Sequence, residues 1–336
     1  MTDRVISRPA SKANSTTILD FLELVALIDP SGRARIDTLI RDQELQAEQA
    51  EDDFGDADTA KDGFVENIEN EFNRRASALG ESYPFLMTDD AEEIVLQVPE
   101  NDPLAGSYLA CLIASQIGDK GDLKLSIPDQ AGLAADIITR MRRRIFQMIG
   151  TIALAGLAKG PAGSIGWPRE EKETIIASMV RAVGRGFPIP VLEEPNWTAL
   201  DGAKDGGVDV IAWEHTDMPP SPSVWFGQIA SGRNWKGKPV IQDALNFSED
   251  FLTAKHKNAN HATIVPFDLD GDEEEAATLH HRHGTILDRL RLSVRFKEGL
   301  LLIADGIEMD ESQNTLVAMT WVNEFVAGLR IINEAA

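Results

Sequence analysis

The sequence contains one cysteine, Cys111, and two tyrosines in 336 residues. A single cysteine excludes a disulfide framework and a cysteine-rich zinc site. No apolar run reaches the roughly 20 residues that a membrane span requires, and the longest, Ile145 to Ala158, is interrupted by Gln147. The start, Met1 to Arg4, lacks the basic-then-apolar pattern of a signal peptide. We therefore expect a cytoplasmic protein with no membrane segment.

Several familiar motifs are also missing. There is no Gly-x-Gly-x-x-Gly before a helix, no Walker loop and no Gly-x-Ser-x-Gly elbow. The acidic run 268–273 lacks Gly at the sixth position of an EF-hand loop and Glu at the twelfth, which excludes a calcium loop. His280 and His283 have helical spacing for a metal pair, but a polar turn before a strand is the favoured interpretation.

The charge is strongly one-sided, with a formal net value of −23. A protein that binds nucleic acid by neutralising phosphates is expected to be basic, so this balance argues against unspecific coating of DNA. The acids concentrate in residues 44–71 and 89–93. The densest basic cluster is Arg140 to Arg144; pairing with the acidic amino-terminal segment is favoured there over phosphate contact.

Periodicity predicts two parts, with the change after Gly160-Pro161. Residues 1–160 form an acidic, mostly helical region, and residues 161–336 form an α/β domain with an α/β/α arrangement. Helical spacing covers 17–28, 36–49, 64–77, 104–117, 130–157, 170–183, 240–254 and 315–333. Strand-like runs cover 93–98 and 262–267 and lie within the segments 205–213 and 224–235, whereas 286–296 carries no assignment.

Two of these strand-like runs carry polar side chains of interest. Asp209 follows the Gly206-Gly207 pair, and Gln228 lies in an otherwise apolar run. If the runs pair as antiparallel strands, Asp209 can lie across from the strand face that carries Gln228. The Cβ atoms of the two residues would then be roughly 5 Å apart. Their oxygens are hard ligands suited to Mg²⁺ or Mn²⁺, which polarises phosphates and lowers the pKa of bound water.

The order helix, strand with Gly-Gly-x-Asp, strand with Gln, helix resembles the PD-(D/E)XK nuclease superfamily, particularly restriction-endonuclease-like proteins of the Mrr type, over about residues 165–300. The resemblance implies that Asp209 is the metal-binding acid and Gln228 the second strand ligand. It also implies a helix-borne acid, chosen as Glu173 from Glu170, Glu171 and Glu173.

The chain departs from the family pattern at Ala230, where the family has a lysine two residues after the second ligand. Lys236 or Lys238, on the loop before the next helix, are expected to act in its place. Arg233 is a further candidate, limited to stabilising charge because its guanidinium is permanently protonated.

Four other residues are candidates for substrate binding. Ser231 and Asn234 lie in a turn that either binds an anion through backbone N–H groups or simply ends the strand with Trp235 as an anchor. Arg289 and Arg291 form either a surface ion pair with Asp288 or phosphate contacts.

The resemblance implies a Mg²⁺-dependent (or Mn²⁺-dependent) endonuclease that hydrolyses DNA phosphodiesters in defence against foreign DNA. The net negative charge then implies that a second copy in a homodimer, or a partner subunit, supplies many of the contacts to DNA. The alternative is a binding or scaffold protein that keeps the nuclease fold without cutting, as Ala230 would allow.

Overall fold

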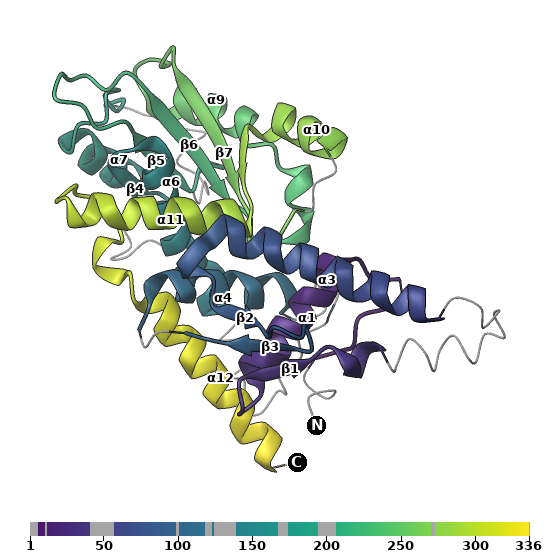
Figure 1. Cartoon of the computed structure of the whole chain (residues 1–336). Helices are drawn as coiled ribbons and strands as arrows, with labels where there is room; N and C mark the ends of the chain where they lie inside the picture. The colour runs from purple at the N-terminus through teal and green to yellow at the C-terminus, as the bar shows by residue number, and fades with distance from the viewer. Residues whose placement is uncertain are drawn as a thin grey trace. The chain divides into compact units, whose positions relative to one another are not determined.

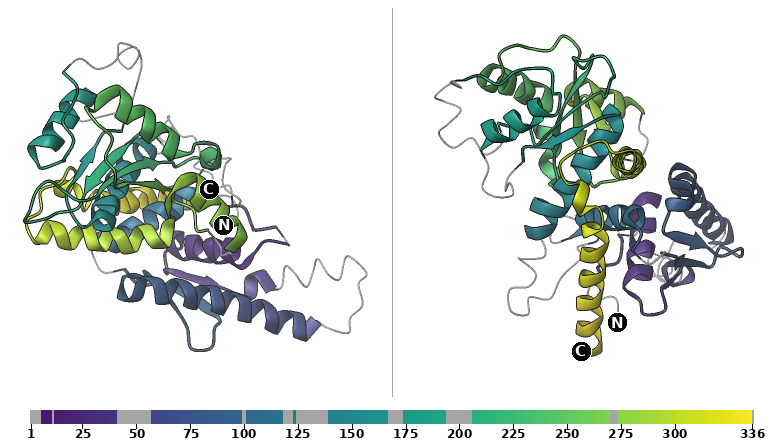
Figure 2. Two further views of the ribbon diagram at one scale, coloured as in Figure 1. Left: turned by 90° about the horizontal axis from the view of Figure 1, so that it is seen from above. Right: turned by 90° about the vertical axis from the view of Figure 1, so that its left-hand side faces the viewer.

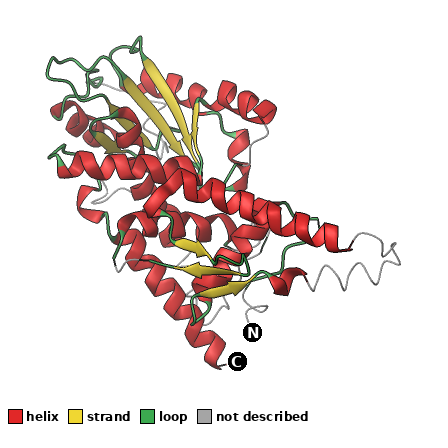
Figure 3. Ribbon diagram, viewed as in Figure 1, coloured by secondary structure: helices red, strands yellow, loops and turns green. Residues whose placement is uncertain are grey.

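The structure is a computed structural model that describes residues 6–10, 12–40, 57–98, 101–117, 123, 139–166, 174–193, 206–269 and 273–335. It divides into two compact units (Figure 1), unit 1 comprising Met1–Ala135 with Met319–Ala336, and unit 2 comprising Asp136–Ala318. Each unit combines helices with a β-sheet (Figure 3), which confirms the predicted α/β class. In the part of the chain that the structure describes, no helix is long and apolar enough to cross a membrane.

The division differs from the boundary expected at residue 160. Helix α6 (Phe146–Ala158) belongs to unit 2, because it packs against the sheet that follows it. Helix α12 (Val317–Ala335) belongs to unit 1 from Met319 onward. A Cβ at Gly106 would lie 2.7 Å from the backbone nitrogen of Met319, so α12 runs directly along the helix that carries Gly106.

Unit 1 is built from helices around a small antiparallel sheet, where only one strand was expected. The sheet has the order β1 (Arg33–Arg35), β3 (Glu93–Leu96), β2 (Phe85–Met87). Its helices include α1 (Ser15–Ile28), α3 (Ala57–Leu79) and α4 (Pro103–Gln116). Asn14 caps α1 by accepting a hydrogen bond from the Thr17 N–H, and Asp102 caps α4 in the same way.

A buried ionic network joins the helices of unit 1. The guanidinium of Arg75 is fully buried and lies 2.9 Å from Asp20, 3.0 Å from Glu23 and 2.8 Å from Glu71. The Tyr108 hydroxyl donates to Glu23 at 2.8 Å. Each carboxylate is therefore held by donors, which is the condition for burying charge at a tolerable cost.

Replacing Arg75 by Met is expected to destabilise the protein by about 3–5 kcal/mol, because three carboxylates lose their common cation inside the core. Chemical denaturation followed by circular dichroism measures this. The control is Arg33→Met, which breaks the exposed pair with Glu93 and should cost about 1 kcal/mol or less. Equal, small losses for both variants would show that the buried network contributes nothing.

Unit 2 contains a five-stranded mixed sheet. The order is β4 (Ala162–Ser164), β5 (Val210–Trp213), β6 (Val224–Ile229), β7 (Ala259–Ile264), β8 (Thr285–Leu287). The first three strands pair antiparallel, and β6, β7 and β8 pair parallel. Helices cover both faces of this sheet (Figures 1 and 2).

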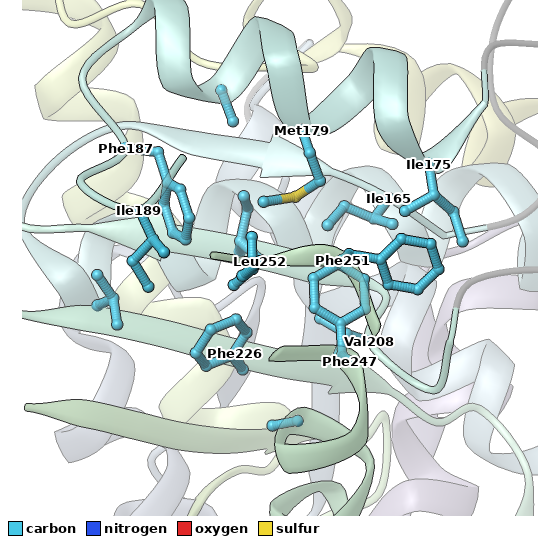
Figure 4. Packing of buried hydrophobic residues seen from close by; sticks show 14 of the residues in the cluster. Ile165, Ile175, Met179, Phe187, Ile189, Val208, Phe226, Phe247, Phe251 and Leu252 are labelled. Atoms are coloured by element: carbon cyan, nitrogen blue, oxygen red, sulfur yellow. The ribbon is translucent and has the colours of Figure 1, made fainter. Parts of the chain in front are cut away.

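One face of the sheet packs against α7 (Ile175–Gly184) and α9 (Val240–Phe251). Figure 4 shows Met179 of α7 and the rings of Phe247 and Phe251 of α9 in one cluster with Phe226 of β6. Alternation along the strand assigns Gln228 to the same face as Phe226. Helix α10 (Glu273–His283) packs beside α9.

The other face carries α6 and α11 (Arg289–Ala304). A Cβ at Gly150 of α6 would lie 2.6 Å from the side chain of Ile229, so the helix lies close to β6. The two helices also pack tightly on each other: a Cβ at Gly156 would lie 2.0 Å from the carbonyl oxygen of Arg295, and one at Gly299 would lie 2.2 Å from that of Ile152. Glycine at positions 156 and 299 is therefore required by close backbone approach.

Asp310 holds the edge strand β4 in place through hydrogen bonds. Its carboxylate accepts hydrogen bonds from the Ser164 N–H at 2.9 Å, from Arg181 at 2.9 Å and from Arg185 at 2.5 Å. Burial alone raises the pKa of Asp310, but the bonds from the two arginines and from Ser164 outweigh it and leave the pKa below its ordinary value. The ionised form is therefore stabilised in the folded protein.

Because the folded pKa of Asp310 is lowered, its contribution should be complete above the ordinary aspartate pKa and lost as the pH falls through the lower folded value. Asp310→Asn should reduce the free energy of unfolding by about 2 kcal/mol at pH 7, and by less at acid pH. Denaturant unfolding at several pH values tests this. Glu308→Gln is the control, since the Glu308 side chain is 83% exposed and 3.9 Å from Arg185. A deficit independent of pH would refute the ionic role.

Candidate functional site

The structure confirms that the two strand-like runs are neighbouring antiparallel strands, and it brings Asp209 and Gln228 together. Val210 pairs with Gly227, and continuing this register by one residue sets Asp209 opposite Gln228. The Asp209 N–H donates to the Gly227 carbonyl at 2.9 Å, and the Ile229 N–H donates to Oδ2 of Asp209 at 2.7 Å. At the end of the β5–β6 ladder, the Asp209 carboxylate thus accepts a main-chain N–H in place of a backbone carbonyl.

The main chain of Asp209 is fixed by three donors. Its carbonyl oxygen accepts bonds from the N–H groups of Ile165 and Gly166, both at 2.7 Å, and from Nε2 of Gln147 at 2.9 Å. The buried Gln147 amide, on α6, also donates to Oγ of Ser164 at 3.0 Å. We did not predict this role. The available signal was a glutamine inside an otherwise apolar helix.

Gln228 has an amide oxygen without a partner. The side chain is buried, with 9% exposed, and Oε1 makes no hydrogen bond within the described part of the chain. Its Nε2 lies 3.5 Å from Oδ2 of Asp243, in the first turn of α9. Buried polar atoms in native proteins almost always have a partner, so an isolated oxygen here points to a ligand.

The oxygens at this point suit a divalent cation. Asp209, Asp243 and the Gln228 amide offer carboxylate and carbonyl oxygens, which are the ligands that Mg²⁺ and Mn²⁺ prefer. Among the residues that the structure describes, no group of three or more His, Cys, Asp or Glu is placed to hold a metal, so the fit depends on the amide oxygen. Glu173, expected as the helix-borne ligand, lies outside the described residues, as do Glu170 and Glu171.

Ala230 occupies an apolar environment. It follows β6 and packs with Trp235, Val265, Leu279 and Ile286. An alanine side chain in this cluster cannot orient a water molecule or stabilise charge.

The expected replacement lysines lie in and just after the short helix η7 (Arg233–Gly237). Nζ of Lys236 is 6.0 Å from the centroid of the Trp235 ring, and Lys238 is exposed where the short helix ends. The guanidinium carbon of Arg233 lies 5.4 Å from the centroid of the Phe267 ring. These cations therefore follow directly on the carboxyl end of β6.

The turn proposed for anion binding is compact. The Trp235 N–H donates to the Gly232 carbonyl at 3.1 Å, and Oδ1 of Asn234 would lie 2.8 Å from a Cβ at Gly232. Asn234 is exposed and Ser231 is half-buried. These contacts fit a turn that ends the strand with the buried Trp235 as its anchor.

The two arginines at the start of α11 differ. Arg289 is fully buried, with its guanidinium 3.7 Å from Asp268, so the expected phosphate contact by Arg289 does not fit its position. Arg291 is 59% exposed and lies 2.5 Å from Asp288, which caps the helix. Burial raises the pKa of Asp288, and Arg291 partly offsets this. Of the two interactions expected for Arg291, the structure shows the ion pair with Asp288.

The histidine run is the last turn of α10, so the polar turn we predicted there is wrong. The His283 ring is buried 5.1 Å from the Trp235 ring, and burial lowers its pKa. His280 is exposed, and its Nδ1 lies 3.0 Å from the Gly284 carbonyl.

The basic cluster lies in unit 2. The turn Met141–Ile145 (η5) is π-helical, a form common at functional sites. Arg144 pairs with Glu311 of the same unit at 2.5 Å. Much of the acidic segment that was expected to pair with this cluster, residues 44–56, lies outside the described residues. Arg140 and Arg143 are exposed.

Comparison of the chain with models of protein families, with curated proteins and with solved structures gave no match.

Replacing Gln147 by Met keeps the length of the side chain but removes the two bonds that it donates to Asp209 and Ser164. The free energy of unfolding should fall by about 1–3 kcal/mol, because the acceptors at the end of β4 lose a buried donor. Thermal and denaturant unfolding measure this. Gln242→Met, on exposed α9 surface, serves as the control and should change stability by about 0.5 kcal/mol or less. An unchanged stability for Gln147→Met would contradict the anchoring role.

Proposed function

We propose that unit 2 is a metal-dependent nuclease that hydrolyses DNA phosphodiester bonds. The observation that carries the proposal is the buried, unpartnered Oε1 of Gln228 beside Asp209. The chain order α6, β4, α7, β5, β6, α9, β7 is compatible with the expected restriction-endonuclease-like core, with α7 between the first two strands. Asp209 comes directly before β5, and Gln228 lies near the end of β6.

Asp209 and Gln228 would hold the cation. A bound Mg²⁺ or Mn²⁺ would polarise the phosphate and lower the pKa of an attacking water. One oxygen of Asp209 accepts the Ile229 N–H, so its position is set by the strand pair before any ligand arrives. Such preorganisation lets an ion bind without rearranging the site.

Positive charge is available at the same end of the sheet, although the chain is acidic. The parallel strands β6, β7 and β8 end there, and the antiparallel β5 begins there, directly after Asp209. Exposed Lys238 follows β6, and exposed Arg143 lies four residues before Gln147, whose amide contacts Asp209. Cations so placed would attract a phosphate backbone.

Defence against foreign DNA would be the setting, and a homodimer or a partner subunit would supply a second site for double-strand cleavage. The rival function is a non-catalytic binding or scaffold subunit. It is favoured by one observation, the apolar packing of Ala230 where the resembling nucleases have their lysine.

Incubating the purified chain with plasmid and linear DNA should give nicking or cleavage in Mg²⁺ or Mn²⁺ and none in EDTA. Asp209→Asn should reduce the rate by at least about a hundredfold, on the order of the loss of one main electrostatic group. Asparagine keeps an oxygen for the Ile229 N–H, so the fold should survive.

Asp217→Asn, an exposed change on the loop between β5 and β6, is the control and should keep full activity. DNA binding without metal-dependent cleavage in the unmodified chain would favour the scaffold function. Preference for RNA over DNA in the same assay would assign a different phosphodiester substrate.

A further inference from the structure

Asp243 is the second carboxylate beside Gln228, and it comes from an element that the family resemblance does not assign to the site. It lies in the first turn of α9, with Oδ2 3.5 Å from Nε2 of Gln228. We propose that Asp243 is a direct ligand of the divalent cation, together with Asp209 and Oε1 of Gln228. This inference rests on the proposed function and adds a third ligand to it.

The loop before β5 is shaped around this carboxylate. Gly207 has a φ of +79°, a conformation that favours glycine. A Cβ at Gly207 would lie 2.6 Å from both Cβ and Cγ of Asp243 and 2.9 Å from Oδ2. The absence of a side chain therefore lets Asp243 approach the backbone two residues before Asp209.

The contact between Asp243 and the Gln228 amide is long. A distance of 3.5 Å is at the outer limit of a hydrogen bond. The register places Asp209 opposite the same amide on β5. Two carboxylates and one unpartnered carbonyl oxygen thus come from α9, β5 and β6, and a divalent cation would bind all three.

A purely structural role is the alternative. A carboxylate in the first turn of a helix interacts favourably with the helix dipole and stabilises the helix without any metal. That role predicts a change in stability alone, so the test needs a direct measurement of metal binding.

Titration of the full chain with Mn²⁺ by isothermal calorimetry, without nucleic acid, provides it. Asp209→Asn and Asp243→Asn should each weaken Mn²⁺ binding by about tenfold or more, at least the loss seen for outer-shell partners. Gln228→Glu should tighten binding, because a third carboxylate adds charge to the ligand set. Asp250→Asn, one aspartate further along α9, is the matched control and should bind as the unmodified chain does.

Gly207→Ala gives a geometric test of the same ligand. Its Cβ would displace Asp243, so Mn²⁺ binding should weaken as it does for Asp243→Asn. Gly306→Ala is its control, because Gly306 has a similar φ of +85° but a Cβ there would meet nothing within 4 Å.

The outcomes separate the two proposals. If Asp209→Asn weakens Mn²⁺ binding while Asp243→Asn and Gly207→Ala do not, Asp243 is no ligand and the metal site of the proposed nuclease stands. If Asp243→Asn weakens binding but the unmodified chain cleaves no DNA, the ligand assignment holds and the nuclease proposal fails. If the unmodified chain binds no Mn²⁺, both are overturned.

Discussion

Backbone-to-backbone contact of α6 with α11 is the constraint on which unit 2 depends. At Gly156 and Gly299 the atoms that a side chain would strike are main-chain atoms of the opposite helix, which cannot rotate away. At Gly150 the same helix lies against Ile229 of β6. These contacts therefore fix the position of the helix between the sheet and α11. In this position Gln147 reaches the end of β4 and the carbonyl of Asp209.

The candidate site is accordingly held by main-chain groups more than by side chains. Asp209 is held through its carbonyl by the two residues after β4 and by α6, and through one carboxylate oxygen by β6. At this site the amide oxygen of Gln228 is the buried atom that has no hydrogen-bond partner in the described part of the chain. Polar side chains on a buried strand are costly unless they bond something, and this cost is the physical basis of the cation site that we propose.

The strand pair could be predicted because 210–213 and 224–229 are rich in β-branched and aromatic residues and are separated by a Pro/Ser-rich loop. The short strands β4 and β8 could not be assigned, since three residues carry no readable alternation. Helix α10 was missed because its eleven residues are mostly acidic or histidine, with little apolar periodicity.

The sequence alone could not predict where residues far apart in the chain lie in space. The boundary between the units was misplaced because nothing in the composition of α6 says which sheet it covers. Arg289 and Arg291, two residues apart, look alike in sequence, yet one is buried beside Asp268 and the other is at the surface. Asp243 is 34 residues from Asp209 in the chain, and only the packing of α9 on the sheet brings it near Gln228.

The interleaving of the two units has a consequence for biosynthesis. Unit 2 is one continuous stretch, Asp136–Ala318, whereas unit 1 needs Met319–Ala336 in addition to its first 135 residues. Domains usually fold in the order in which they leave the ribosome. Here unit 1 is complete only when α12 has been translated, so unit 2 is the first whose residues are all present.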